Sequence, residues 1–235
     1  MGRDDAAAPQ RGRIERVGAT RERILVTAER LFAEHGVFAV SNRQIGEAAG
    51  QGNTAAVGYH FGARTGLVRA IVRRHAEPIE RVRERMVAVI GDRPDLRDQV
   101  SCLVRPSTEH LAALGVPSWY ARFSAQVLAD ASLREVVLDE ALASPALRRL
   151  LAGLHRCRPD LPAEVVDERD GMTGQLIVHL CAERERALAA GTATPRATWR
   201  DAATGLIDAI TGLWSAPASS APGDRTNTTS DGGVG

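Results

Sequence analysis

Apolar residues recur at the spacing of one face of an α-helix through most of this 235-residue chain. Over residues 20–35 this spacing predicts an amphipathic helix that ends at Gly36, because glycine is a favoured helix stop. A longer stripe over residues 64–90 predicts a second helix, in which Pro78 should produce a kink or a split. The sequence has no alternating runs of β-branched residues, so we expect no sheet and an all-α fold.

Further helices are expected downstream, and low-complexity segments border them. The predicted helices span residues 95–114 with a bend or interruption at Pro106, 117–130, 132–155 with a break near Ser144 and Pro145, 163–190 and 195–214. Residues 1–19 and 215–235 have compositions typical of disorder. These boundaries divide the chain into a disordered arm (1–19), a head (20–65), a helical body (66–214) and a disordered tail (215–235).

Residues 41–61 contain two short helical segments around a glycine turn. Ser41 is a candidate N-cap, and Gln44 can complete a capping box with it. The segment Gly50–Gly52 should end the first helix, and Asn53 is a candidate N-cap for a second helix from Thr54 to His60. This layout is typical of a helix-turn-helix, whose second helix enters the DNA major groove.

The charge distribution supports a DNA-binding head. Residues 1–75 hold 12 arginines against 7 acidic residues, whereas residues 76–235 hold 18 against 22. A basic N-terminal third on a mildly acidic remainder is the pattern expected for a nucleic-acid-binding head on a separate body.

Several classes of protein are not expected from this sequence. No apolar run approaches the length of a membrane span, and the N-terminus has no apolar signal segment. Cys102, Cys157 and Cys181 lack zinc or redox spacing, which favours reduced thiols in a cytoplasmic protein. The sequence has no phosphate loop, His-Glu metal motif or nucleophile elbow, so we expect no enzyme activity, cofactor or metal.

The chain resembles the TetR family of bacterial transcriptional regulators, and especially its actinobacterial-type members. The matching residues are Ala28, Leu31, Phe32, Gly36, Ser41, Ile45, Ala48, Ala49, Gly50, Val57, His60, Phe61 and Leu67. The turn carries one extra residue, Gly58 stands where the family usually has tyrosine, and Arg64 replaces its usual lysine. The resemblance implies a homodimer on a palindromic operator and a body that binds a small hydrophobic effector, whose binding spreads the two heads.

The residues expected to contact double-stranded DNA lie on the two short helices and at the start of the next one. Asn53, Thr54 and Ala55 lie at the start of the second short helix, where backbone N–H groups favour acceptors. Gly58 either permits close approach of the duplex or is merely tolerated. The remaining candidates are Ser41, Arg43 and Arg64 for phosphates, Ala55 and Ala56 for thymine methyl groups, and Tyr59 and His60 for phosphate or sugar, with a structural role as the alternative for His60.

The body offers candidate effector and dimer residues. The effector candidates are Trp119, Arg122, Phe123, Gln126, Met172, Gln175 and His179, each with ordinary core packing as the alternative. Small residues share a face of the last predicted helix at Ala202, Gly205, Ala209 and Gly212, and a face of the preceding helix at Gly171 and Gly174. Two such helices suit a two-fold four-helix interface or close packing within one chain. A ligand-released repressor is the function favoured, and an activator or a ligand-independent regulator is the alternative.

Overall fold

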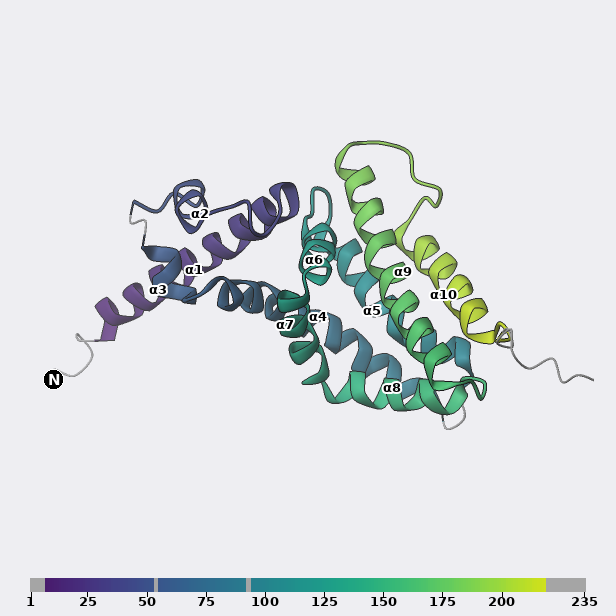
Figure 1. Ribbon diagram of the computed structural model, residues 1–235. Helices are drawn as coiled ribbons and strands as arrows, with labels where there is room; N and C mark the ends of the chain where they lie inside the picture. The colour runs from purple at the N-terminus through teal and green to yellow at the C-terminus, as the bar shows by residue number, and fades with distance from the viewer. Residues whose placement is uncertain (1–6, 53–54, 92–93, 219–235) are drawn as a thin grey trace, which may run out of the picture.

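The computed structural model describes residues 7–52, 55–91 and 94–218, and within them every regular element is an α-helix (Figure 1). These helices are α1 (Ala7–His35), α2 (Asn42–Ala48), α3 (Ala56–Phe61), α4 (Arg64–Val89), α5 (Leu96–Leu114), α6 (Tyr120–Ala129), α7 (Ala131–Leu142), α8 (Pro145–Cys157), α9 (Ala163–Ala189) and α10 (Trp199–Ser215). The all-α prediction is confirmed. Within the described residues, no helix combines the length and apolar character that a membrane span requires.

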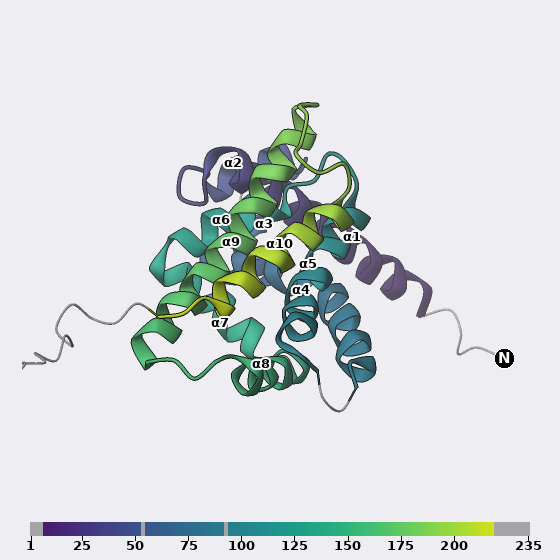
Figure 2. The ribbon, with the colours of Figure 1, turned by 90° about the vertical axis from the view of Figure 1, so that its right-hand side faces the viewer.

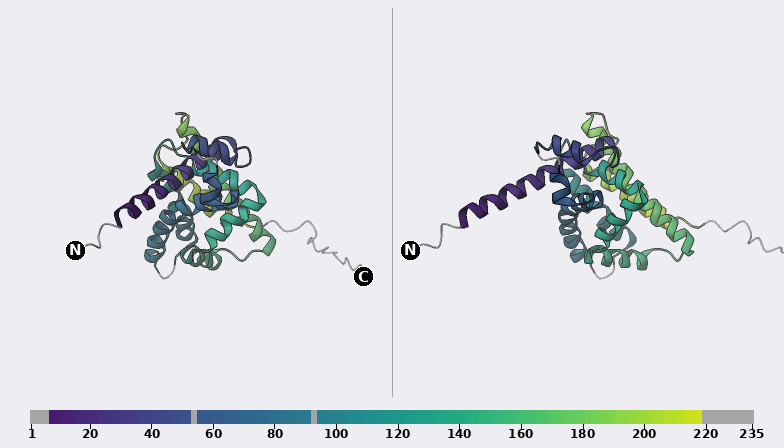
Figure 3. Two further views of the ribbon diagram at one scale, coloured as in Figure 1. Left: turned by 90° about the vertical axis from the view of Figure 1, so that its left-hand side faces the viewer. Right: turned by 60° about the vertical axis from the view of Figure 1, so that its left-hand side comes forward.

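Helix α1 begins at Ala7, so the predicted disordered arm is wrong over residues 7–19. Pro9 falls in the first turn, where a helix needs no N–H donor, and the residues after it are mostly compatible with a helix. The N-terminal half of α1 projects away from the other helices (Figure 3). The predictions for residues 1–6 and for the tail from 219 onward fall outside the described residues.

Proline begins a helix at one site in the body and lies inside a helix at two others. Ser144 caps α8 by accepting the Leu147 N–H, and Pro145 is its first residue, so the predicted break separates α7 from α8. Helices α4 and α5 each continue through an internal proline, Pro78 and Pro106. Of the predicted kink or split at Pro78, the split does not occur, since α4 runs unbroken from Arg64 to Val89 with buried residues on both sides of the proline.

Two hydrophobic clusters hold the molecule together. The first joins the head to α6 and α7, and Phe32 of α1 stacks on Phe123 of α6 with ring centroids 6.3 Å apart. The second fills the space among α5, α9 and α10 around Val104, Ile207 and Ile210. Helices α9 and α10 form the surface on the side away from the head, and Figure 2 looks directly onto it. The head is therefore packed onto the body through a shared core.

Candidate nucleic-acid interface

Helix α2 begins with the predicted capping box. The Gln44 N–H donates to Ser41 Oγ at 3.2 Å, and the Ser41 N–H donates to Gln44 Oε1 at 2.8 Å. These two bonds satisfy backbone donors that a short helix leaves free at its first turn. Ile45 fixes the inner face in the head core, and Gly50 turns the chain with a φ of +69°. The capping box and the glycine stop are thus confirmed.

Helix α3 is short and is positioned by its neighbours. It spans Ala56–Phe61, two residues shorter at its start than predicted, and Asn53 and Thr54 lie outside the described residues. A six-residue helix is not stable alone, so packing must hold it. Val57 is buried in the head core, and Arg21 of α1 places its guanidinium over the Phe61 ring at 5.1 Å. These contacts turn one face of α3 inward and leave the other accessible.

The accessible face of α3 carries Ala55, Gly58 and Tyr59. Tyr59 is 84% exposed, an unusual state for an aromatic side chain, and its ring meets His60 edge-on with centroids 5.2 Å apart. A Cβ added at Gly58 would meet no atom within 4 Å, so packing inside the protein does not require glycine there. The face therefore has an aromatic group with a hydroxyl beside a glycine that no other side chain covers, which suits a sugar-phosphate chain lying close to it.

The structure gives two of the predicted DNA contacts a different role. Ala56 is only 9% exposed and belongs to the head core, so it cannot contact a base. Arg64 donates from Nη1 to the Val37 carbonyl oxygen at 2.5 Å and lies over the Phe32 ring, 5.5 Å from its centroid. Burial lowers the pKa of the Arg64 guanidinium. Arg64 thus fastens the start of α4 to the loop after α1 instead of facing outward.

Ser41 and Arg43 remain exposed at the start of α2. The Ser41 hydroxyl donates to Gln44 Oε1 at 2.8 Å, and Arg43 Nε donates to Glu47 Oε1 at 2.8 Å. That hydrogen bond raises the pKa of Arg43. The pair is solvent-exposed and worth little energy, so the guanidinium can exchange Glu47 for a phosphate at small cost. Both residues therefore stay candidates for backbone contacts.

Two family models match this chain over the regions just described. The model for bacterial regulatory proteins of the tetR family matches residues 24–71, and the model for a tetracyclin repressor-like C-terminal domain matches residues 101–212. The chain belongs to the TetR family. It has that family's DNA-binding and C-terminal domains and is a TetR-family transcriptional regulator.

Solved TetR-family structures resemble this chain in fold at low sequence identity. The regulator PfmR from Thermus thermophilus is 18% identical, with a TM-score of 0.50 over 85% of this chain and 98% of PfmR. A putative TetR-family regulator from Rhodococcus sp. is also 18% identical, with a TM-score of 0.41 over 84% of this chain and 100% of its own. The multidrug binding protein EbrR, solved with imidazole, is 22% identical, with a TM-score of 0.42 over 85% of this chain and 92% of its own. No curated protein matches the sequence.

The seven effector candidates do not form one site in this TetR-family body. Trp119 and Phe123 pack against the head core, and Gln126 is exposed. Met172, Gln175 and His179 instead line an open groove on the outer face of α9. The prediction of a single pocket is wrong, because the rotation of α9 in the fold turns these three side chains away from α6.

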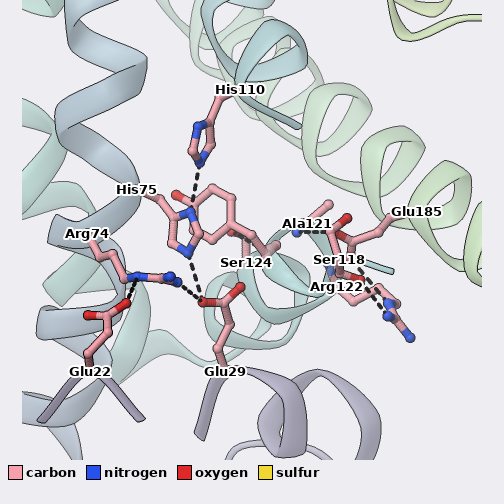
Figure 4. A network of polar contacts seen from close by, with 11 residues as sticks. Glu22, Glu29, Arg74, His75, His110, Ser118, Ala121, Arg122, Ser124 and Glu185 are labelled. Carbon is pink, nitrogen blue, oxygen red and sulfur yellow. Dashed lines mark hydrogen bonds and ion pairs between the residues drawn. The ribbon is translucent and has the colours of Figure 1, made fainter. Parts of the chain in front are cut away.

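Arg122 was an effector candidate because a buried polar group needs a partner, and the structure supplies that partner within the chain. The Glu185 carboxylate of α9 lies 3.2 Å from Arg122 Nε and accepts the Arg122 backbone N–H at 2.9 Å. The same carboxylate accepts the Ser118 hydroxyl at 2.8 Å and the Ala121 N–H at 3.2 Å (Figure 4). Glu185 therefore caps the start of α6 from another helix, since Trp119 provides no side-chain cap.

A second buried polar cluster joins the head to the body, and the sequence analysis missed it. His75 of α4 contacts Glu29 Oε2 of α1 through Nε2 at 2.8 Å and His110 Nε2 of α5 through Nδ1 at 2.7 Å (Figure 4). Its ring stacks on Tyr120 of α6 with centroids 3.8 Å apart, and Arg74 donates to Glu29 at 3.1 Å. The feature of the sequence that could have predicted this cluster is His75 itself, a histidine inside an otherwise apolar helical stripe.

The small residues proposed for dimerisation lie on α9 and α10, and Gly174 also lines a cavity between these helices and α5, α7 and α8. A Cβ added at Gly171, Gly174 or Gly212 would meet no atom within 4 Å, so these glycines are not packed against the same chain. Gly205 is closest to the Arg196 side chain, at 3.7 Å, while Ala202 is half-buried and Ala209 exposed. Met172 and Leu180 are large apolar side chains exposed on the same helix α9. Packing within one chain therefore accounts for little of this surface.

Proposed function

We propose that this TetR-family protein is a cytoplasmic repressor that binds a palindromic operator as a homodimer and is released by a small hydrophobic ligand. The observation that carries the DNA-binding part is the outward face of α3. Tyr59 is exposed there and Gly58 has open space beside it, while Val57 holds the helix to the head. Such a face has no packing purpose in the isolated chain, and it fits a duplex groove.

Homodimerisation is supported by the uncovered surface of α9 and α10. Its glycines and exposed apolar side chains would bury well against the same surface of a second copy. A two-fold axis through this surface would set the separation of two heads, which for half-sites one helical turn apart is about 34–36 Å. The operator is then expected to be an inverted repeat.

Ligand release is supported by a cavity of about 660 Å³ in the body, bounded by α5, α7, α8, α9 and α10. Its volume lies within the range of roughly 300–1,000 Å³ usual for small-molecule sites. The cavity beside Phe123 is smaller, about 160 Å³. A ligand releases DNA only if it binds the spread arrangement of the heads more tightly than the DNA-bound one.

The decisive experiment is selection of bound sequences from a random DNA pool, followed by affinity measurements on the recovered site. We expect one symmetric motif. Tyr59→Ala should weaken its binding at least about tenfold, whereas Leu114→Ala, which alters an exposed apolar residue at the end of α5 in the body, should leave it unchanged. Recovery of no motif, or equal affinity of the Tyr59→Ala protein, would contradict the proposal.

A further inference from the structure

The N-terminal half of α1, residues 7–23 and here called the α1 extension, projects from the head past α3, on the side away from the body (Figure 1, Figure 3). We propose that it is a second DNA-binding element, which begins at Arg21 and contacts the phosphate backbone beside the half-site that α3 reads. This inference rests on the proposed operator binding and extends the interface beyond the two short helices.

Arg21 is the point at which the α1 extension meets α3. Its guanidinium lies over the ring of Phe61, the last residue of α3, 5.1 Å from the ring centroid, while Arg21 itself remains exposed. Stacking uses the flat face of the guanidinium and leaves the N–H donors, which lie in its plane, for another partner. Arg21 is therefore a positioned cation next to the accessible face of α3, and its fork of donors matches a phosphate.

Within the described part of the chain, no carboxylate lies at ion-pair distance from Arg21. The neighbouring Glu22 is turned to α4, where its Oε1 lies 2.7 Å from Arg74 Nε. Arg64, which the sequence analysis assigned to a phosphate, is instead bonded to the Val37 carbonyl oxygen. The head therefore has an unneutralised arginine at the C-terminal end of α3, and that arginine is Arg21 and not Arg64.

The charge of the α1 extension is opposite to the charge that stabilises the start of a helix. Residues 7–23 contain five arginines and two glutamates, and the first turn of α1 has no acidic residue. Acidic residues are the favourable ones near a helix N-terminus, because that end of the helix dipole is positive. Helix stability therefore does not explain these arginines, and a polyanion is the partner that complements them.

The rest of the α1 extension is uncovered and long enough to reach flanking DNA. Val17 is 45% exposed, and a Cβ added at Gly18 would meet no atom within 4 Å. The turns from Ala7 to Thr20 span about 21 Å at a rise of about 1.5 Å per residue, which equals the length of about six base pairs. The extension can therefore follow the duplex beyond the half-site.

The helical register divides the other arginines of the α1 extension into two pairs. With about 3.6 residues per turn, Arg11 and Arg13 occupy positions about 80° to either side of Arg21. Arg16 and Arg23 occupy positions about 140–160° from Arg21, on the opposite side of the helix. Arg11 and Arg13 are therefore the pair expected to contact flanking phosphates on the side where Arg21 meets α3.

The first test measures affinity by fluorescence anisotropy on the selected operator with about six further base pairs on each side, over a range of salt concentrations. Arg21→Gln should weaken binding at least about tenfold and lower the slope of log affinity against log salt by about 2, one phosphate for each subunit. Arg21→Lys keeps the charge and should retain most of the binding. An unchanged slope in the Arg21→Gln protein, or an equal loss in both proteins, would overturn the assignment of Arg21.

The second test examines the two arginine pairs. The double variant Arg11→Gln/Arg13→Gln should bind the long duplex about tenfold more weakly than the wild type and should match the wild type on a duplex trimmed to the half-sites. The matched control is Arg16→Gln/Arg23→Gln, which removes the same charge from the opposite side of the same helix and should bind both duplexes like the wild type. Equal losses in the two double variants would overturn the proposed contact, and so would weaker self-association of the Arg11→Gln/Arg13→Gln protein in sedimentation, which would assign the extension to a second copy of the chain.

An unrelated duplex of equal length is measured in parallel, so that the two proposals can fail independently. If the chain selects no motif but the Arg11→Gln/Arg13→Gln protein binds the unrelated duplex more weakly than its control does, the operator proposal fails and the DNA contact of the extension stands. If an operator is found and the variants of the extension bind it like the wild type, the DNA contact of the extension fails alone.

Discussion

Glu185→Ala should be among the most destabilising single changes in this protein. The Glu185 side chain is 2% exposed and is the sole side-chain cap for the start of α6 in the described structure. Removing it leaves the Ser118 hydroxyl and two backbone N–H groups without an acceptor. It also leaves the largely buried Arg122 guanidinium without its carboxylate.

The expected loss follows from the cost of leaving buried polar groups unpaired. Breaking a buried ion pair by deleting one partner costs about 3–5 kcal/mol, and a single unsatisfied donor about 1–3 kcal/mol. These costs overlap, because the Arg122 side chain can turn toward water and Arg122 Nη2 keeps its bond to the Ser118 carbonyl. We therefore expect the free energy of unfolding to fall by about 3–5 kcal/mol, a large part of the 5–15 kcal/mol typical of a domain.

The measurement is urea unfolding followed by circular dichroism, with Glu183→Ala as the matched control. Glu183 lies on the same helix, its side chain is 70% exposed, and it forms an exposed ion pair with Arg186. Both changes replace glutamate by alanine within α9, so the gain in helix propensity is the same for each. Protein concentration must be equal in all samples, since dimerisation contributes to apparent stability.

The reasoning would be refuted if Glu185→Ala destabilised the protein by less than about 1 kcal/mol more than Glu183→Ala. Glu185→Gln tests the charge, because its amide keeps one acceptor oxygen and the shape of the side chain. It should fall between the wild type and Glu185→Ala. Hydrogen exchange should show the extra loss at the first amides of α6.

Three further outcomes are expected. Burial and the neighbouring His75 and Arg74 lower the pKa of His110 to about 4, so the unfolded chain binds more protons than the folded one between pH 6.5 and 4. The stability that depends on neutral His110 should be fully present above pH 6.5 and fall by about 1–2 kcal/mol as the pH drops to 4, after discounting for partial exposure. His110→Gln should reduce this loss in pH-dependent urea melts. Gly58→Ala should stabilise the protein by up to about 1 kcal/mol yet weaken operator binding, and an unchanged affinity would show that Gly58 is merely tolerated. Arg64→Ala should cost about 1–2 kcal/mol in thermal unfolding and leave the salt dependence of DNA affinity unchanged, whereas a phosphate contact would lessen that dependence.

Features set by neighbouring residues were predictable from the sequence. The capping box of Ser41 and Gln44 needs only residues three positions apart, and the Ser144–Pro145 break depends on the proline itself. The early start of α1 was missed because a composition typical of disorder was given more weight than the helical tendency of its alanines and arginines. Local signals thus fixed most helix ends.

Roles that depend on distant partners were not predictable. Arg64 bonds a carbonyl 27 residues earlier, and Arg122 meets a carboxylate 63 residues later. The inward or outward direction of Met172, Gln175 and His179 depends on how α9 is rotated in the fold, and the polar pattern of α9 gives little guidance because both of its faces carry polar groups. An exposed arginine and a buried one look alike until their neighbours are known.

The connections between head and body differ in strength, and this difference decides which of them a ligand can alter. At one junction His75 and Glu29 are buried and Phe32 stacks on Phe123, so moving α1 away from α6 would expose both a core and a buried polar contact. At the other, Arg73 is 66% exposed where it meets Glu140, so water can replace the carboxylate at the arginine, whereas the Glu140 side chain is only 10% exposed and also bonds Arg69. Shifting α7 along α4 would leave the Phe32–Phe123 stack and the His75–Glu29 contact in place, whereas separating α1 from α6 would break the stack. A ligand in the body cavity of about 660 Å³ would therefore reach the head through α7 and α4, because α6 is bonded to α9 through Glu185 as well as packed against α1.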